Sequence, residues 1–292
     1  MQNKTKWSES ESTSVRSVSF KTSGKPASDG DGVRLTRVIG VAGFEELDPF
    51  LMLDRFESNN PDDYIGGFPP HPHRGFETVT YLLAGKMRHE DNKGHKGIIE
   101  TGGVQWMTAG RGIIHSEMPE QTNGLLNGFQ LWVNLPAEQK MVEPSYQEFS
   151  AASIPCEERP GTRLKVIAGK TSQDTIGPVK NDYISPLMID VTLAINTLFI
   201  EPLPKDDNVF IMVIDGELEL PENNKHITLQ TNELAVLSNG TEIRVKALAD
   251  NTQFLMVSAT PLQESIARGG PFVMNTQEQI EQAFRDYKNG QF

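Results

Sequence analysis

The stretch YLLAGKMRHEDNKG, residues 81–94, returns in altered form as MVIDGELELPENNK, residues 212–225. In both stretches a strand-length apolar run ends at a glycine turn, and a second strand-length run follows. The downstream segments also correspond: GGVQWMTAGRGIIHSE (102–117) matches TNELAVLSNGTEIRVKA (231–247) with a one-residue gap. Internal similarity of this kind predicts a duplicated β domain.

Short apolar runs bounded by Gly, Pro, Asn or Asp continue along the chain from Val33, and helical periodicity is scarce before the last twenty residues. This pattern is typical of an all-β sandwich or barrel. We expect five parts: a flexible tail at 1–15, an N-terminal domain at 16–145, a linker at 146–160, a C-terminal domain at 161–265 and a closing segment at 266–292.

The closing segment contains the one strong helix signal. Thr276 can cap a helix, and Gln279 three residues later completes a capping box. Apolar residues then follow helical spacing: Ile280, Ala283, Phe284 and Tyr287. We expect a short amphipathic helix that packs against the body of the protein.

Composition excludes several classes of function. The net charge of −12 over 292 residues argues against a nucleic-acid-binding protein, which needs a basic surface to displace counterions from phosphates. No apolar run is long enough to cross a bilayer, and the polar N-terminus lacks a signal core. Cys156 is the single cysteine, which suits a reducing compartment. We therefore expect a cytoplasmic protein.

Five of the six histidines lie between residues 71 and 115. Residues two apart on a strand point to the same face, so His71 projects with His73, and His115 projects with Glu117. Three imidazoles and a carboxylate suit iron, zinc, nickel or manganese. The corresponding positions of the second copy hold Pro202, Pro204, Val245 and Ala247. The pattern therefore predicts one metal site, in the first domain, and a metal-free second domain.

The remaining histidines have a more ordinary interpretation. His89 and His95 lie in the charged stretch RHEDNKGHKG, which predicts a solvated hairpin loop, although His95 could border a pocket. His226 is expected in a turn. A His-x-His pair is itself weak evidence for a metal, because such pairs also occur in ordinary loops.

The pattern G-x-x-x-x-H-x-H-x-x-x-E from Gly66, followed by a glycine turn and by G-x-x-H from Gly112, resembles the two halves of the cupin barrel motif. Longer segments resemble the pirin family: HPHRGFETVTYLL (71–83), QWMTAGRGIIHSEMP (105–119), FQLWVNLPAEQKMVEP (129–144) and GPFVMNT (270–276). The resemblance implies an all-β bicupin, with two tandem jelly-roll-like barrels and a short C-terminal helix.

The resemblance leaves a choice of carboxylate ligand. In most metal-binding cupins the Glu of the first motif binds the ion, and this would be Glu77, which shares strand parity with His71 and His73. The pirin resemblance instead implies His71, His73, His115 and Glu117 as ligands, with Glu77 outside the set. We follow the pirin assignment because that match is the closer one.

Pirins are similar to quercetin 2,3-dioxygenases, and this similarity implies a chemistry. The expected substrates are a flavonol and O2, and the expected ion is iron, with zinc, nickel or manganese as alternatives. The flavonol 3-hydroxyl would bind the ion, Glu117 would accept its proton, and ring cleavage would release carbon monoxide. Phe68, Phe76, Trp106 and Met118 are candidates to line the pocket, although core packing is the more ordinary role for Phe76 and Trp106.

Two other functions stay open at this point. Pirins are also associated with transcriptional regulation, so the chain could bind a protein partner in a metal- or redox-dependent way without turnover. A zinc isomerase acting on sugar phosphates would need a basic pocket, for which the motif regions offer Arg74, Lys86, Arg88 and Arg111. Because two fused cupins bury the face that single cupins use to dimerise, we expect a monomer.

Overall fold

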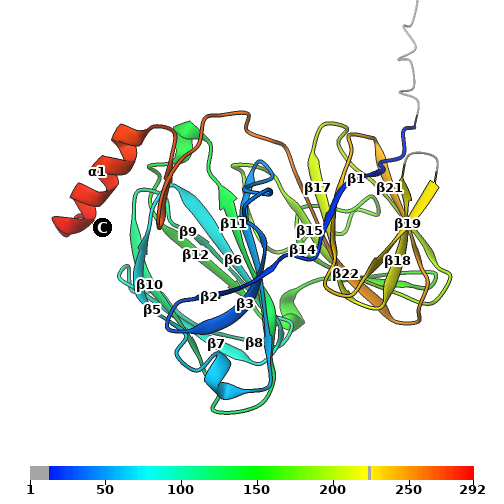
Figure 1. The fold of residues 1–292 in the computed structure, drawn as a ribbon, viewed down its shortest axis with the longest axis horizontal. Coiled ribbons are helices and arrows are strands. Elements are labelled where there is room, and N and C mark those ends of the chain that lie inside the picture. Colours follow the sequence, from blue (N-terminus) through cyan, green and yellow to red (C-terminus); the bar gives the residue numbers. More distant parts are fainter. Residues whose placement is uncertain (1–12, 223–224) are drawn as a thin grey trace, which may run out of the picture.

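The computed structural model describes residues 13–222 and 225–292, so most of the expected tail at 1–15 lies outside the described residues. Within them, strands dominate and α1 (Gln277–Lys288) is the single α-helix. Three short 3-10 helices lie in loops: η1 (Pro61–Asp63), η2 (Ala137–Gln139) and η3 (Ala151–Ser153). The prediction of an all-β chain with a closing helix is confirmed (Figure 1).

The N-terminal half contains one seven-stranded and one four-stranded sheet. From edge to edge the larger sheet has β12 (Ser145–Phe149), β9 (Val104–Thr108), β6 (Phe76–Ala84), β11 (Leu126–Asn134), β4 (Phe50–Ser58), β3 (Val33–Ile39) and β2 (Lys25–Asp29). The smaller sheet has β5 (Phe68–His73), β10 (Ile113–Pro119), β7 (Lys86–Asp91) and β8 (Lys96–Glu100).

The C-terminal half repeats this arrangement strand for strand. Its larger sheet has β1 (Val18–Thr22), β20 (Leu234–Leu237), β17 (Asn208–Asp215), β22 (Thr252–Ala259), β15 (Leu187–Leu193), β14 (Thr162–Ala168) and β13 (Cys156–Arg159). Its smaller sheet has β16 (Leu198–Pro202), β21 (Glu242–Ala247), β18 (Glu217–Glu222) and β19 (Lys225–Gln230). The predicted duplication of a β domain is therefore confirmed.

Both ends of the chain cross from one domain to the other. β1 pairs with β20 at the edge of the second large sheet. It occupies the position that corresponds to that of β12, which pairs with β9 at the edge of the first large sheet. The expected boundaries placed residues 16–22 in the N-terminal domain, whereas the structure places β1 in the C-terminal sheet. An edge strand can pair wherever a free edge is available, and local sequence does not specify which edge.

The expected linker at 146–160 is largely strand. β12 pairs with β9 of the first domain, and β13 pairs with β14 of the second. Between these two strands, a short stretch that includes η3 connects the domains. The chain after the second domain returns to the first as a two-stranded hairpin, β23 (Ala267–Gly269) with β24 (Phe272–Met274), followed by α1.

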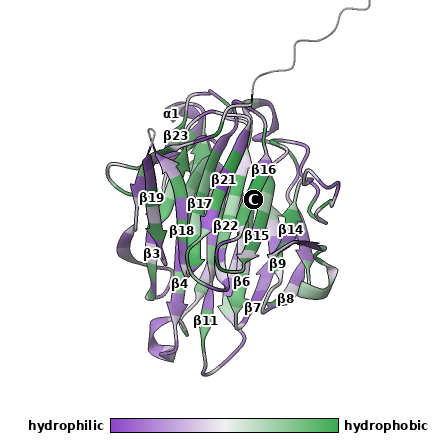
Figure 2. Ribbon diagram, turned by 90° about the vertical axis from the view of Figure 1, so that its right-hand side faces the viewer, coloured by the Kyte–Doolittle hydropathy of each residue, from purple (hydrophilic) through white to green (hydrophobic). Residues whose placement is uncertain are grey.

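The largest hydrophobic core lies between the domains, where the two seven-stranded sheets face each other. Val79, Tyr81 and Leu131 of the first sheet pack in one buried cluster with Phe210 and Leu255 of the second. Hydrophobic and hydrophilic residues alternate along several of these strands (Figure 2). One face of each large sheet is therefore used for the interface, and the other faces the interior of its own barrel.

The two barrel interiors differ in chemistry. The second is filled by a cluster of buried apolar side chains that includes Val245 and Ala247, the counterparts of His115 and Glu117. The first buries polar groups, among them His73, His115 and Glu117. The polar interior therefore lies in the N-terminal barrel.

The C-terminal helix has the predicted cap. The Thr276 hydroxyl accepts from the Gln279 amide at 3.3 Å, and the Gln279 side chain accepts from the Thr276 amide at 3.1 Å. Ile280 is buried, as predicted, whereas Phe284 is about half exposed, with its ring against that of Phe272. In residues 13–222 and 225–292, no helix is long and apolar enough to cross a membrane.

Candidate metal centre

Three of the predicted ligands converge inside the N-terminal barrel. Antiparallel pairing of β5 with β10 places His115 directly opposite His71 and Ile113 opposite His73. The ring centroids are 4.4 Å apart for His71 and His115, 5.0 Å for His73 and His115, and 4.7 Å for His71 and His73. One nitrogen atom of each ring lies within 4.8 Å of the corresponding nitrogen atoms of the other two rings. These distances allow all three imidazoles to bind one ion.

Each of these rings uses its Nδ1 outside the cluster. The Nδ1 of His71 lies 2.8 Å from the Pro69 carbonyl, and that of His73 lies 3.4 Å from the Pro271 carbonyl. A carbonyl oxygen only accepts, so Nδ1 carries a proton in both rings, and in the neutral ring the lone pair lies on Nε2. The Nε2 of His115 is buried and has no hydrogen-bond partner. An orphaned buried nitrogen among two others fits a bound transition-metal ion.

Burial also keeps the rings of His73 and His115 neutral. Desolvation lowers the pKa of His73 and of His115 well below 6.5, and the neighbouring imidazoles lower it further. A neutral imidazole is the form that binds a metal, because its free nitrogen lone pair is then available. Both rings are therefore ready to bind an ion at neutral pH.

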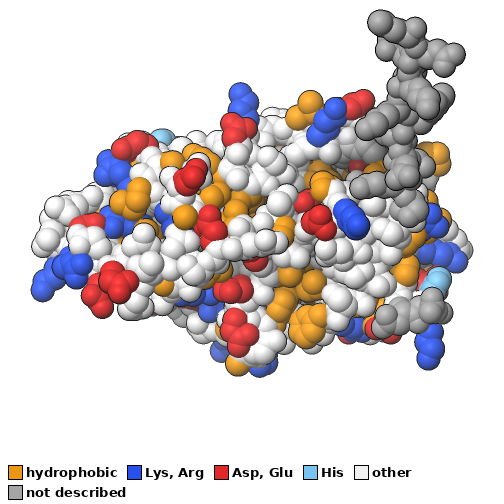
Figure 3. All heavy atoms as spheres, turned by 90° about the horizontal axis from the view of Figure 1, so that it is seen from above, with side chains coloured by type: hydrophobic (Ala, Val, Ile, Leu, Met, Phe, Trp, Pro, Cys, Tyr) orange, Lys and Arg blue, Asp and Glu red, His pale blue; other side chains and the backbone are white. Residues whose placement is uncertain are grey.

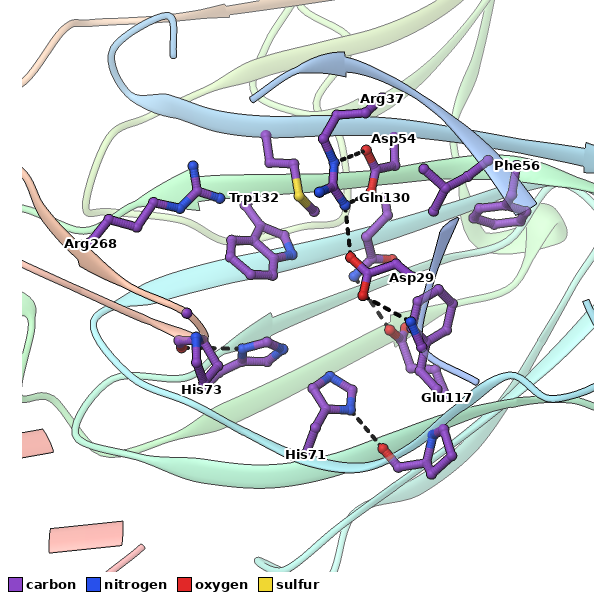
Figure 4. Close-up of a pocket in the computed structure, with 17 residues that line it drawn as sticks. Asp29, Arg37, Asp54, Phe56, His71, His73, Glu117, Gln130, Trp132 and Arg268 are labelled. Carbon is purple, nitrogen blue, oxygen red and sulfur yellow. Dashed lines mark hydrogen bonds and ion pairs between the residues drawn. The ribbon is translucent and has the colours of Figure 1, made fainter. Parts of the chain in front are cut away.

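The fourth predicted ligand, Glu117, lies on the same pocket but outside the three-histidine cluster. Thr80 donates to its Oε1 at 2.6 Å, and the Gln105 side chain donates to the same oxygen. Gln130 donates to Oε2 at a longer 3.3 Å. Oε2 is thus the less engaged oxygen of a buried carboxylate that faces the pocket (Figure 4).

The competing carboxylate, Glu77, points the other way. β5 ends at His73 and β6 begins in a different sheet, with Gly75 in the turn at a φ of +87°, so the strand parity seen in the sequence does not continue. Glu77 accepts from Thr108 at 2.7 Å and from Asn181 of the second domain. Burial raises its pKa to about 7. Its carboxyl group lies at the domain interface.

A cavity of about 540 Å³ opens beside the histidines. Its apolar lining consists of Leu35, Met52, Phe56, Phe68 and Trp132. Three polar residues, Asp29, Arg37 and Asp54, line the side that lies away from His71 and His73 (Figure 4). Concave sites of this size with a few convergent polar groups are typical of small-molecule binding.

The aromatic lining was only partly predicted. Phe68 does line the cavity, whereas Phe76 and Trp106 are buried in the core, which confirms their ordinary role, and Met118 is not part of the lining. Sequence reasoning missed Trp132, whose ring lies 5.1 Å from that of His73. The alternation in FQLWVNL could have indicated this position, because Trp132 lies on the same face of its strand as the polar Gln130.

The family models decide the relationship: the pirin model matches residues 32–133, and the pirin C-terminal cupin model matches residues 188–292. The chain belongs to the pirin family. A pirin-like protein of Caulobacter vibrioides is 48% identical over 95% of this chain and 99% of that one. A Pseudomonas aeruginosa relative named "Putative quercetin 2,3-dioxygenase" is also 48% identical, over 95% of this chain and 98% of its own length. The crystal structure of an Acinetobacter baumannii quercetin 2,3-dioxygenase is 33% identical, with a TM-score of 0.86 over 96% of this chain and 99% of that one.

The basic residues near the motifs of this pirin-family protein do not line the cavity. Their carboxylate partners are Asp286 for Arg74, Glu100 for Lys86, Glu90 and Glu120 for Arg88, and Glu143 for Arg111. The cations of the cavity are Arg37, which is paired with Asp54, and Arg268, which lies 5.3 Å over the Trp132 ring. The four residues considered for a sugar-phosphate isomerase therefore form no phosphate pocket.

The returning C-terminal segment contacts the turn that follows His73. The Val273 amide donates to the Arg74 carbonyl at 3.0 Å, and the Arg74 guanidinium donates to Asp286 of α1 at 2.7 Å. The buried Lys140 ammonium ties the two segments together, because it donates to the carbonyls of Gly75 and Val273 at 2.8 and 3.0 Å. The pirin-family site is thus braced by residues far apart in sequence.

The prediction for His89 is wrong. It was expected in a solvated loop, but its side chain is fully buried in β7 and its ring stacks on Tyr146 at 4.3 Å. Lys86, Arg88 and Glu90 lie on the outer face of β7, whereas alternation directs His89 inward, toward His115. His95 is partly exposed, in agreement with its expected position at a surface.

Proposed function

We propose that this protein is a metal-dependent dioxygenase that cleaves flavonols such as quercetin with O2, using one iron ion held by His71, His73, His115 and Glu117. The observation that carries the proposal is the convergence of three imidazoles beside a buried carboxylate, at the end of an aromatic-lined cavity. The similarity to the Acinetobacter baumannii quercetin 2,3-dioxygenase supports the same activity.

An iron ion bound to these residues would supply a Lewis acid for the flavonol 3-hydroxyl and a redox centre for O2. The protein's own contribution begins with Glu117, whose Oε2 is placed to accept the hydroxyl proton. Thr80 and Gln105 hold the other oxygen, so the carboxylate keeps a fixed orientation in the cavity. We therefore assign Glu117 both ligand and general-base roles.

The cavity walls fit a flat polyphenol. Trp132 and Phe68 offer apolar ring faces, while Gln130 and the Arg37–Asp54 pair can exchange hydrogen bonds with peripheral hydroxyls. Arg37 is held by both oxygens of Asp54, at 2.8 and 2.7 Å, so its position in the wall is fixed before a substrate binds.

Oxygen uptake on adding quercetin to iron-loaded protein tests the proposal. We expect uptake together with carbon monoxide release, both lost in His73→Ala, which removes a ligand. Tightly bound iron without uptake would refute the dioxygenase and point to the metal-dependent binding protein considered above. On the face shown in Figure 3, acidic, basic and apolar side chains are interspersed, so no single charged region there indicates such a partner.

A matched pair of variants tests the carboxylate assignment. Glu117→Gln should lower iron affinity, and Glu77→Gln should leave it unchanged, since Glu77 faces the second domain. Both substitutions replace one buried carboxyl group with an amide of similar size. The reverse result would assign the ion to Glu77.

A further inference from the structure

A line of polar side chains leads from His115 to the surface. The Nδ1 of His115 lies 3.5 Å from the Nδ1 of His89, and the Nε2 of His89 lies 3.1 Å from Oδ2 of Asp91. His95 contacts the same Asp91 oxygen through its Nδ1 at 2.8 Å. The side chains of His89 and Asp91 are fully buried, whereas His95 is 38% exposed.

Local structure fixes the carboxylate of this line. Asp91 ends β7, and the turn that follows brings the amides of Lys93 and His95 to its Oδ1, at 2.9 and 3.0 Å. Oδ2 is then left to face the two imidazoles. Burial acts to raise the pKa of Asp91, but hydrogen bonds, first those from His89 and His95, outweigh burial and lower it. Asp91 is therefore ionised at neutral pH.

An ionised carboxylate decides where the protons of the neighbouring rings lie. It can only accept, so Nε2 of His89 donates to it, and in the neutral ring the Nδ1 of His89 is an acceptor. The Nδ1 of His115 must then donate to it, which leaves the lone pair of His115 on Nε2. That nitrogen is the one that is buried without a partner in the three-histidine cluster.

His115 differs in this respect from the other two histidines of the cluster. His71 and His73 each face a backbone carbonyl, which fixes their tautomer directly. His115 faces an imidazole, which can donate or accept, so its tautomer depends on what the second ring contacts. The stack of His89 on Tyr146, with 19° between the ring planes, holds that second ring in place.

We propose that His89 and Asp91 are positioning residues of the metal site, which hold His115 in the tautomer whose Nε2 binds the ion. The inference rests on the proposed ligand role of His115. Neither residue touches the ion or the substrate. They act through the orientation and protonation of His115 alone, as outer hydrogen-bond partners do in other metal sites.

Two substitutions of His89 separate this role from simple packing. His89→Gln keeps an acceptor for His115 and a donor for Asp91, but loses the aromatic stack on Tyr146. His89→Phe keeps the stack and loses both nitrogens. We expect the dissociation constant for zinc, measured by competition with a chelator, to rise about 10–100-fold in His89→Phe. It should change little in His89→Gln, and likewise in His226→Ala, a control in the second domain.

The opposite order, tight binding in His89→Phe and weak binding in His89→Gln, would overturn the proposal in favour of packing. Melting temperatures of the two variants would show whether each is folded. Nitrogen-15 NMR of the metal-free protein gives a second readout, in which Nε2 of His115 and Nδ1 of His89 should both be unprotonated. Wild-type protein that binds no zinc but shows these tautomers would refute the ligand set and leave the hydrogen-bond line intact.

Discussion

The buried Glu77 carboxyl makes the stability of the protein depend on pH in a way that a single substitution should remove. Its side chain is 1% exposed, and burial raises its pKa from 4.5 to about 7. A shift of this size corresponds to about 3 kcal/mol of unfolding free energy. Because the folded-state pKa is the higher one, this stability is complete below pH 4.5 and is lost as the pH rises through about 7.

Glu77→Gln should remove this dependence while keeping the local contacts. The new amide can donate to the Thr108 hydroxyl and accept from Asn181, so both hydrogen bonds have a replacement. Relative to wild type, the variant should therefore gain about 3 kcal/mol in unfolding free energy between pH 4.5 and pH 8. Comparing the two proteins cancels the contributions of His73 and His115, which titrate in both.

Urea unfolding of metal-free protein, followed by fluorescence at several pH values, measures the difference. Glu138→Gln, at an exposed carboxylate, serves as the matched control and should track wild type throughout. A constant difference between Glu77→Gln and wild type across this range would refute the assignment of a raised pKa to Glu77. It would also mean that the carboxyl is better solvated at the domain interface than the structure shows.

Three further predictions concern the site and its support. Arg74→Met should lower the free energy of unfolding by about 2 kcal/mol, because Asp286 loses a charged hydrogen-bond donor, and an unchanged melting temperature would contradict this. Trp132→Ala should weaken quercetin binding about tenfold and leave zinc affinity unchanged, as measured by titration calorimetry. Unchanged quercetin affinity would show that Trp132 does not contact the substrate. Zinc at about 100 times its dissociation constant should stabilise the metal-free protein by about 2.7 kcal/mol, and no rise in melting temperature would show that zinc does not bind preferentially to the folded protein.

The sequence was sufficient for features that depend on residues near one another in the chain. Alternation along a strand has a period of two, so His71 and His73 had to share a face, and the repeat gave two β domains with one polar interior. The capping box of Thr276 and Gln279 is equally local and was found as predicted. Family resemblance added the cupin fold, which the family models and the structure confirm.

Local patterns failed where a turn or a distant partner changed the direction of a side chain. The turn at Gly75 ends the parity that linked Glu77 to the histidines, and only the sheet pairing shows that Glu77 faces the second domain. The charged neighbours of His89 led to the prediction that its side chain is exposed to solvent. That prediction failed because composition does not reveal that a polar strand can keep one face buried against another sheet.

What the amino-acid sequence determined by itself was the number of domains, their strand character and the residue types available for a metal. The tertiary structure alone decided which of these residues meet. The crossing of β1 to the second sheet, the return of α1 to the first domain and the bracing of His73 by Pro271 join residues that are far apart in the chain. Such contacts depend on which edges and carbonyls are left free after both barrels have formed, and no periodicity within one segment contains that information.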